Sequence, residues 1–241
     1  MNVLNNKSKQ NSSADPVPTK NDMYNSYAHK RGIIFDMDNT LLQSKINFQA
    51  MKEETYAFLV EQCVLPEGLP LQQYTTSTII EEAIATNRMT AGLLQAMWEI
   101  PVKHEVEGMQ GAVLEPGVTE LLDKLHGSYH LAVVTNNSEK AANAALRDNG
   151  IIHYFDHVAG REHMQSLKPS PDGFIYILNR YPTTSGRDWL SIGDSWIDGK
   201  ASERAGIEFI AYQADIETMK NAEVFPRKYF SHMSELMELL T

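Results

Sequence analysis

Cysteine is almost absent from this sequence of 241 residues, because Cys63 is the only one. A single thiol excludes an internal disulfide, so we expect a protein of the reducing cytoplasm. The sequence also lacks any uncharged apolar run of about 18 residues, the minimum for a membrane-spanning helix. We therefore expect no membrane partner.

Positive charge is scarce as well. The chain has 21 Lys and Arg residues against 31 Asp and Glu residues, which gives a formal net charge of −10. Nucleic-acid backbones are bound by clusters of basic residues, so this balance excludes nucleic acid as a main partner. With 42% hydrophobic and 22% charged residues, the composition is that of a globular protein. The length allows one large α/β domain and a small second module.

Apolar residues are sparse in the first stretch, residues 1–30, which is rich in Asn, Ser, Lys and Pro. Such a composition does not support a packed core. The stretch has no apolar h-region of a signal peptide, and Asp15 and Asp22 are atypical of a transit peptide. We expect a disordered leader, with a tethering or targeting segment as the alternative.

From residue 31 onward, short apolar runs alternate with helical patterns. The runs predict strands at residues 33–35, 131–134, 157–159, 189–192 and 208–212. Strands that are separated by helix-length segments are typical of βαβ units. The sequence therefore predicts an α/β fold with a Rossmann-like, doubly wound parallel sheet.

Helix boundaries between these strands are marked by capping and stop residues. The signals are Pro116 and Pro171 as helix starts, Ser138 and Ser234 as N-caps, and Gly150 and Gly206 as C-terminal stops. They predict a helix from residue 118, a helix over 139–148, one from 171, one over 198–205, and a final one that ends near Leu240.

The interval 43–112 breaks the alternation, because it contains amphipathic segments and no convincing strand. We interpret it as a helical cap domain that is inserted into a core domain formed by residues 31–42 and 113–241. The alternative is an elaborated crossover within a single domain. The polar stretch 43–47 and the two glycines within 108–111 suit a hinge. Three positive residues of the insertion are candidates for substrate contact: Lys45, Arg88 and Lys103.

Two aspartates, Asp36 and Asp38, follow the first predicted strand directly. Carboxylates two residues apart at a turning strand end are able to face one cavity. One of them can attack phosphorus, while the other transfers a proton to the leaving oxygen and later takes one from water. The alternative is a solvated turn in which Asn39 and Thr40 are turn and cap residues.

A second acidic pair, Asp194 and Asp198, lies where the fourth predicted strand meets a helix. Residues at this spacing can both reach one cation, and carboxylates with water and substrate oxygens form the shell that Mg²⁺ prefers. The alternative is a capped helix start in which Asp194 or Ser195 binds backbone N–H groups.

Two further polar segments follow strand ends or precede helices. Thr135, Asn136 and Asn137 offer a hydroxyl and N–H groups that suit a phosphate, or they are simply an N-cap. Lys168 is placed to neutralise phosphate and hold a carboxylate, or it is a surface lysine. Because ligands of doubly wound sheets bind at the carboxyl ends of the strands, we expect Thr135 to converge with Asp36 and Asp194 if the first strand lies centrally between the second and the fourth.

The order of these segments resembles that of the haloacid-dehalogenase-like (HAD) hydrolase superfamily. The matching segments are residues 35–41, 133–136, 168–171 and 193–198. The resemblance extends over about residues 31–212. The position of the helical insertion, between the first two segments, is similar to that in the phosphoglycolate-phosphatase-like branch.

The resemblance implies a role for each candidate residue. Asp36 would be the nucleophile and Asp38 the general acid and base, while Thr135 and Lys168 would hold the phosphoryl group, with Asn136 beside them in the substrate site. The implied cofactor is Mg²⁺, bound by Asp36, the backbone carbonyl of Asp38, and Asp194, with Asp198 supporting the metal shell. Asn39 stands where many members have Gly, and we expect the turn to tolerate it because Asn adopts the left-handed conformation readily.

The function that follows is Mg²⁺-dependent hydrolysis of a small phosphorylated metabolite through an aspartyl-phosphate. The presence of Asp38, which the dehalogenases of the superfamily lack, favours phosphoryl transfer. The alternatives are a sugar-phosphate mutase with the same chemistry and a non-catalytic regulatory protein. Release of inorganic phosphate without a bisphosphate activator distinguishes a hydrolase from a mutase. Both a monomer and a homodimer are compatible with the sequence.

Overall fold

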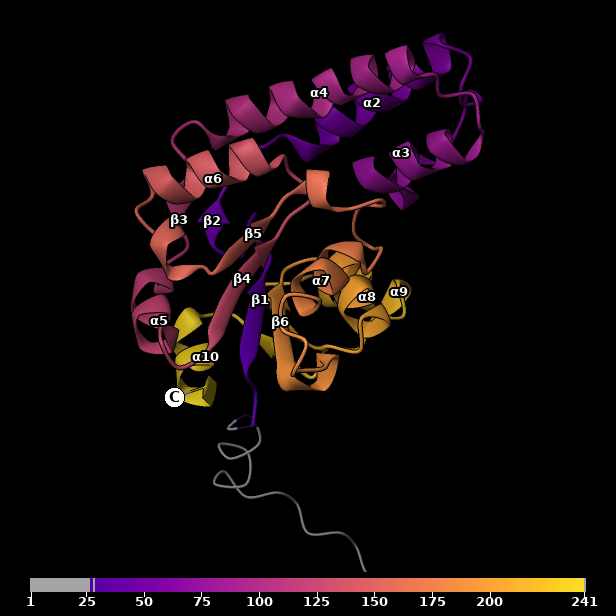
Figure 1. The fold of residues 1–241 in the computed structure, drawn as a ribbon. Helices are drawn as coiled ribbons and strands as arrows, with labels where there is room; N and C mark the ends of the chain where they lie inside the picture. The colour runs from indigo at the N-terminus through magenta and orange to yellow at the C-terminus, as the bar shows by residue number, and fades with distance from the viewer. Residues whose placement is uncertain (1–26, 28, 241) are drawn as a thin grey trace, which may run out of the picture.

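The central element of the computed structural model, which describes residue 27 and residues 29–240, is a six-stranded parallel sheet (Figure 1). The strand order is β5-β4-β1-β6-β7-β8. The strands are β1 (Gly32–Phe35), β4 (His130–Val134), β5 (His157–Ala159), β6 (Trp189–Gly193), β7 (Glu208–Tyr212) and β8 (Lys228–Phe230). The five predicted strands are confirmed, whereas the edge strand β8 was not predicted.

Strand β1 occupies the middle of the sheet. Its Ile33 pairs with Leu131 of β4 on one side and with Leu190 of β6 on the other. The chain runs outward from β1 in both directions, so the strand order reverses there, as in doubly wound folds. The predicted α/β fold class is confirmed.

Helices cover both faces of the sheet (Figure 1). One face packs against α5 (Val118–Leu125), α6 (Glu139–Asp148) and α10 (Met233–Leu240). The other face packs against α7 (Asp172–Leu178), α8 (Trp196–Arg204) and α9 (Ile216–Asn221). Alternate residues of β1 pack against the two helical layers: Ile33 and Phe35 face the layer of α5, α6 and α10, and Ile34 faces the other layer.

Most predicted helix ends are confirmed. The Ser138 side chain accepts a hydrogen bond from the Ala141 N–H, and Gly150 and Gly206 follow their helices with positive φ angles of 73° and 71°. The prediction for Ser234 was wrong, because α10 begins one residue earlier and Ser234 lies inside it. The Glu235 carboxylate accepts from the N–H groups of Ser231 and His232 at this helix start.

The insertion is helical, as expected. It comprises α2 (Phe48–Glu61), the short 3-10 helix η1 (Leu71–Gln73), α3 (Thr76–Ala85) and α4 (Ala91–Met109), which share an apolar cluster of their own. These helices lie over the carboxyl end of β1 (Figure 1). At their base, β2 (Leu42–Gln43) pairs antiparallel with β3 (Val113–Leu114), a small sheet that was not predicted. No helix in the described part of the chain has both the length and the hydropathy of a membrane span.

The expected boundary of the leader at residue 30 needs a correction. Tyr27 and Lys30 are both buried, and Lys30 Nζ lies 3.1 Å from a carboxylate oxygen of Glu208 on β7. The Tyr27 hydroxyl donates to the same carboxylate. The packed structure therefore includes Tyr27, because Glu208 provides a partner for both side chains. The rest of the expected leader, residues 1–26 and 28, lies outside the described residues.

Candidate active site

The chain turns sharply after β1 and so directs two aspartates toward the insertion. The Asp36 N–H donates to the Ile192 carbonyl at 2.8 Å, which extends the β1–β6 ladder by one residue. Asn39 then adopts a left-handed conformation with φ of 56°, and its N–H donates to the Leu42 carbonyl. The turn therefore tolerates Asn39, as expected.

Lys168 lies at the centre of the site and is 1% exposed. Its Nζ donates to Asp36 Oδ1, to Asp198 Oδ1 at 2.7 Å and to the Val134 carbonyl at 2.9 Å. An ammonium group has three N–H donors, so all are used. Burial alone would lower the pKa of Lys168, but the carboxylates of Asp198 and Asp36 outweigh it and raise that pKa. The alternative of a surface lysine was wrong.

The side chain of Asn136 holds the backbone of Lys168 in place. Its Oδ1 accepts from the Lys168 N–H at 2.8 Å, and its Nδ2 donates to the Lys168 carbonyl at 3.1 Å. This pair of hydrogen bonds links the end of β4 to the loop before α7. Asn136 was predicted to contact substrate. Its side-chain amide positions Lys168, while Asn136 also lines the cavity, so the predicted contact with substrate stays a prediction.

Asp38 is held by a neighbour of Asn136. The Asn137 side-chain amide donates to Asp38 Oδ2 at 2.6 Å, and Asp38 as a whole is 8% exposed. Burial raises the pKa of Asp38 to about 6, although the hydrogen bond from the Asn137 amide partly opposes the shift. A carboxyl group with such a pKa exchanges protons readily near neutral pH.

Thr135 ends β4 as a buried residue. Its Oγ1 accepts from the Asn137 N–H at 3.2 Å, so the hydroxyl proton remains to be donated to a ligand. The Ser138 N–H is also taken, because it donates to Glu105 Oε2 at 3.3 Å. Within the predicted phosphate cradle, residues 135–137, the Thr135 N–H donates to the Ala159 carbonyl and the Asn137 N–H to Thr135 Oγ1, so both are already paired within the protein.

Asp198 lies in the first turn of α8, against the end of β6. Its Oδ2 accepts from the Ser195 N–H at 3.1 Å, while Oδ1 faces Lys168. A Cβ atom on Gly193 would lie only 2.7 Å from the Asp198 side chain. The site thus requires glycine at the end of β6, since any larger residue would displace Asp198.

Three carboxylates lie close enough to share a cation. Asp36, Asp194 and Asp198 each offer an oxygen, and these oxygens lie within 4.8 Å of one another. Burial raises the pKa of Asp194 to about 7, with a further contribution from the Asp198 carboxylate. Burial likewise raises the pKa of Asp36, opposed by Lys168 and reinforced by Asp198 and Asp194. The three carboxylates offer only oxygen donors, and a bound cation would relieve the repulsion between them. Such a set of ligands fits Mg²⁺.

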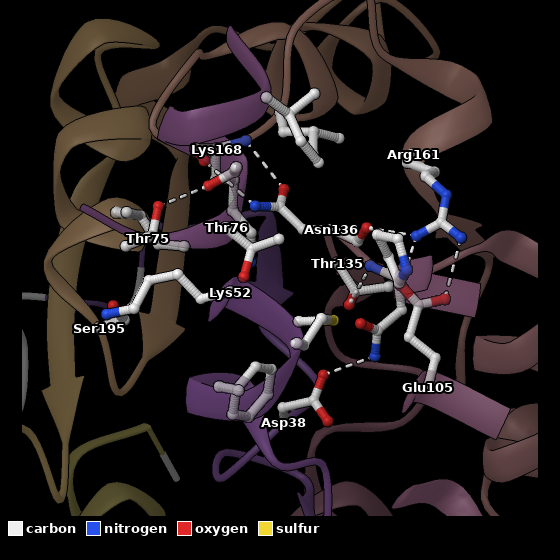
Figure 2. Close-up of a pocket in the computed structure, with 18 of the residues that line it drawn as sticks. Asp38, Lys52, Thr75, Thr76, Glu105, Thr135, Asn136, Arg161, Lys168 and Ser195 are labelled. Carbon is white, nitrogen blue, oxygen red and sulfur yellow. Dashed lines mark hydrogen bonds and ion pairs between the residues drawn. The ribbon is translucent and has the colours of Figure 1, made fainter. Parts of the chain in front are cut away.

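The candidate catalytic, substrate-binding and metal-binding residues of the core line one cavity of about 320 Å³; Figure 2 labels Asp38, Thr135, Asn136 and Lys168 among them. They are Asp36, Asp38, Thr135, Asn136, Lys168, Asp194 and Asp198. The insertion contributes much of the remaining wall, including Phe48, Lys52, Thr75 and Trp98. The cavity therefore lies between the insertion and the carboxyl edge of the sheet.

A buried ion pair on one side of this cavity was not predicted. The Arg161 guanidinium donates to both carboxylate oxygens of Glu105 on α4, at 3.0 Å for Nη2 to Oε2. The guanidinium also lies 4.9 Å from the centroid of the Trp98 ring. Burial raises the pKa of Glu105, and Arg161 opposes that shift. No local pattern relates two residues 56 positions apart, so this pair could not be predicted from the sequence.

The positive residues proposed for the insertion lie elsewhere. Lys45, Arg88 and Lys103 do not line the cavity. Arg88 donates to the Cys63 carbonyl, and Lys103 lies 3.5 Å from Glu54 on the exposed side of the insertion. The cation of the insertion that lines the cavity is Lys52, because the first turns of α2 face the site.

Residues 33–212 match the family described as haloacid dehalogenase-like hydrolase. The chain is 28% identical over 193 residues to a phosphoglycolate phosphatase of Rhodobacter capsulatus, covering 75% of this chain and 83% of that protein. It is 29% identical over 159 residues to a fructose-1-phosphate phosphatase of Escherichia coli, covering 66% and 82%. The HAD-hydrolase YfnB of Bacillus subtilis, whose crystal structure is described as bound to magnesium, matches with a TM-score of 0.56 and 25% identity, covering 88% of this chain and 99% of that one. The chain belongs to the haloacid dehalogenase-like hydrolase family.

Proposed function

We propose that this protein hydrolyses phosphate monoesters of small metabolites through an aspartyl-phosphate on Asp36, with Mg²⁺ as cofactor. The observation that carries the proposal is the convergence of Asp36, Asp38 and Lys168 in one cavity with the pair Asp194 and Asp198. Two relatives named for the hydrolysis of small phosphate esters support it.

In the first step the Asp36 carboxylate attacks phosphorus, and the bond from phosphorus to the leaving oxygen breaks. Asp38 gives its proton to that oxygen, which its raised pKa of about 6 favours. The Thr135 hydroxyl and Lys168 stabilise the negative charge on the phosphoryl oxygens. The products of this step are a free alcohol and a phosphorylated Asp36.

In the second step Asp38, now ionised, takes a proton from water. The resulting nucleophile attacks phosphorus, releases inorganic phosphate and restores the Asp36 carboxylate. The Asn137 amide keeps Asp38 in place for both transfers, through its 2.6 Å hydrogen bond.

The residues that would hold Mg²⁺ are Asp36, Asp194 and the backbone carbonyl of Asp38, with Asp198 in support. When bound, the ion offsets the charge of the carboxylates and of the phosphoryl group. Lys168 alone provides one positive charge against the nearby carboxylates of Asp36 and Asp198.

The insertion, residues 43–112, acts in this proposal as a cap that closes over the site. Two observations support this role. The insertion forms part of the cavity wall, and the ion pair between Glu105 and Arg161 joins the insertion to the core. A closed cap excludes bulk water during transfer, and it opens for substrate entry and product release.

Replacing Asp36 by Asn tests the proposal, because Asn keeps the shape of the side chain and removes the anionic nucleophile. Phosphate release from small esters in Mg²⁺ should fall by at least about 10³-fold. The control is Asp156→Asn, an exposed carboxylate outside the cavity, which should retain nearly full activity. Wild-type turnover in a folded Asp36→Asn variant would overturn the mechanism.

A further inference from the structure

Lys52, in the second turn of α2, is the cation that the insertion places on the cavity wall. Its Nζ donates to the Leu71 carbonyl at 2.9 Å and to the Tyr74 carbonyl at 3.1 Å. An ammonium group has three N–H donors, so one remains unused by the described residues. Both partners are neutral, so the positive charge of Lys52 is not compensated.

The other cations of the cavity differ in this respect. Lys168 is paired with the carboxylates of Asp36 and Asp198, and Arg161 is paired with Glu105. No carboxylate of the described residues pairs with Lys52. Because a partly buried charge is stable when it is paired, an anion in the cavity would complete the environment of Lys52.

Lys52 belongs to the insertion, whereas the candidates for phosphoryl chemistry belong to the core. Figure 2 shows Lys52 near Thr75 and Thr76 of the insertion, whereas Glu105 and Arg161 lie on the opposite side of the site. The catalytic candidates all come from the ends of the core strands and the loop before α7. A group that contacts Lys52 therefore belongs to the part of the substrate that leaves as the alcohol.

We propose that Lys52 determines specificity by binding an anionic group, a carboxylate or a second phosphate, on the leaving part of the substrate. This inference rests on the proposed hydrolase function. The competing role is purely structural, in which Lys52 only ties α2 to the segment from Leu71 to Tyr74 through the two carbonyls.

Three esters with the same three-carbon chain test the inference. They are 3-phosphooxypropanoate, propane-1,3-diol bisphosphate and 3-hydroxypropyl phosphate, which carry a carboxylate, a second phosphate and a neutral hydroxyl. We expect the wild-type kcat/KM to be higher for one of the charged esters by about 10-fold or more. Which charged ester is preferred identifies the anion.

Lys52→Met removes the charge and keeps the apolar stem. It should lower the ratio of kcat/KM for the preferred charged ester over the neutral ester by about 10- to 100-fold, the effect expected for one charge-assisted hydrogen bond. Lys52→Arg should retain most of the ratio. Lys103→Met is the matched control, because Lys103 lies on the same insertion outside the cavity, and it should leave the ratio unchanged.

A wild-type enzyme that hydrolyses the neutral ester as well as either charged one would overturn the inference without any variant. Equal losses on all three esters in Lys52→Met would assign Lys52 the structural role instead. Absence of phosphate release from every ester, including p-nitrophenyl phosphate, would reject the proposed hydrolase function itself, and the inference with it.

Discussion

Lys168 and Asp38 differ in whether their charge is fixed or changes with proton transfer. Lys168 donates all three of its protons to fixed acceptors, so its charge is stationary and suited to binding an anion. Asp38 has one strong donor, the Asn137 amide, and a pKa of about 6 that burial raises. It is therefore suited to giving and taking protons, a role that a permanently charged group does not perform.

Asp38→Asn should impair alkyl esters more than aryl esters. A sugar alkoxide needs a proton to leave, whereas a nitrophenolate leaves readily without one, so the loss should reach about 10²- to 10⁴-fold on the alkyl ester only. The loss is measured as kcat/KM on fructose 1-phosphate and on p-nitrophenyl phosphate, because kcat/KM reports the first transfer and not the later attack of water, in which Asp38 acts as base for both esters. Equal losses on both would assign Asp38 a positioning role.

The raised carboxyl pKa values also predict how stability depends on pH. Without metal, folding raises the pKa of Asp38 to about 6 and that of Asp194 to about 7. The folded protein then binds protons more tightly than the unfolded chain. Its stability from these groups is full below about pH 4 and is lost as pH rises through 6 to 7.

Thermal melting between pH 5 and 8 measures this loss. In chelator, Tm should fall as pH rises, because the stabilisation from these groups is lost. Mg²⁺ should restore Tm at pH 8, because it binds the ionised carboxylates. Asp194→Asn removes one of the titrating groups and should flatten the profile. Two results would contradict the assignment of the pH dependence to these carboxyl groups. One is a Tm in chelator that falls as much in Asp194→Asn as in the wild type, and the other is a Tm at pH 8 that Mg²⁺ leaves unchanged.

At the scale of elements, local signals predicted most strands and helix ends, because those depend on neighbouring residues. The Ser138 cap and the Gly150 stop are examples. Features that depend on distant partners were missed. The two-residue strands β2 and β3 are too short to show a pattern, and the start of α10 is fixed by the Glu235 carboxylate instead of Ser234.

The ion pair between Glu105 and Arg161 joins the insertion to the loop after β5. Both side chains are buried, with exposures of 2% and 9%. Glu105 also accepts from the Ser138 N–H at the start of α6. The pair therefore fixes the position of α4 relative to the core on one side of the cavity.

Arg161→Met should leave the Glu105 carboxylate buried without its partner. Removing one member of a buried pair typically costs about 3 to 5 kcal/mol. The double variant Glu105→Gln, Arg161→Met should recover part of the lost free energy of unfolding, because no unpaired charge remains buried. Urea unfolding of these variants measures the free energy.

The exposed pair of Lys103 and Glu54 provides the control for this prediction. Its side chains are 56% and 44% exposed, so Lys103→Met should change stability by less than about 1 kcal/mol. Similar small changes in Arg161→Met and Lys103→Met would show that the buried pair contributes no more than a surface contact.

At the scale of the whole molecule, one edge of the sheet collects residues from distant parts of the chain. Asp36, Thr135 and Asp194 follow β1, β4 and β6, which are neighbours in the sheet. Their convergence could be predicted, because parallel strands place their carboxyl ends at the same edge. The contribution of the insertion could not be predicted, since it depends on which helix faces turn toward the core.

The positions of Lys52 and Glu105 illustrate this limit. Both lie on amphipathic helices whose pattern indicates only which residues pack within the insertion. Their approach to the site depends on how α2 and α4 are placed above the sheet, and no local signal encodes that placement. The convergence of the core residues was therefore easier to predict than the part of the cavity wall that the insertion forms.

The most direct measurement of the central claim is detection of the covalent intermediate. The enzyme is mixed with a good substrate in Mg²⁺, quenched in acid within the first turnover, digested and examined by mass spectrometry. A phosphoryl group should appear on the peptide that contains Asp36, and it should be absent from Asp36→Asn. Burst-phase turnover of the wild type without that modification, or with phosphate on another residue, would contradict the account.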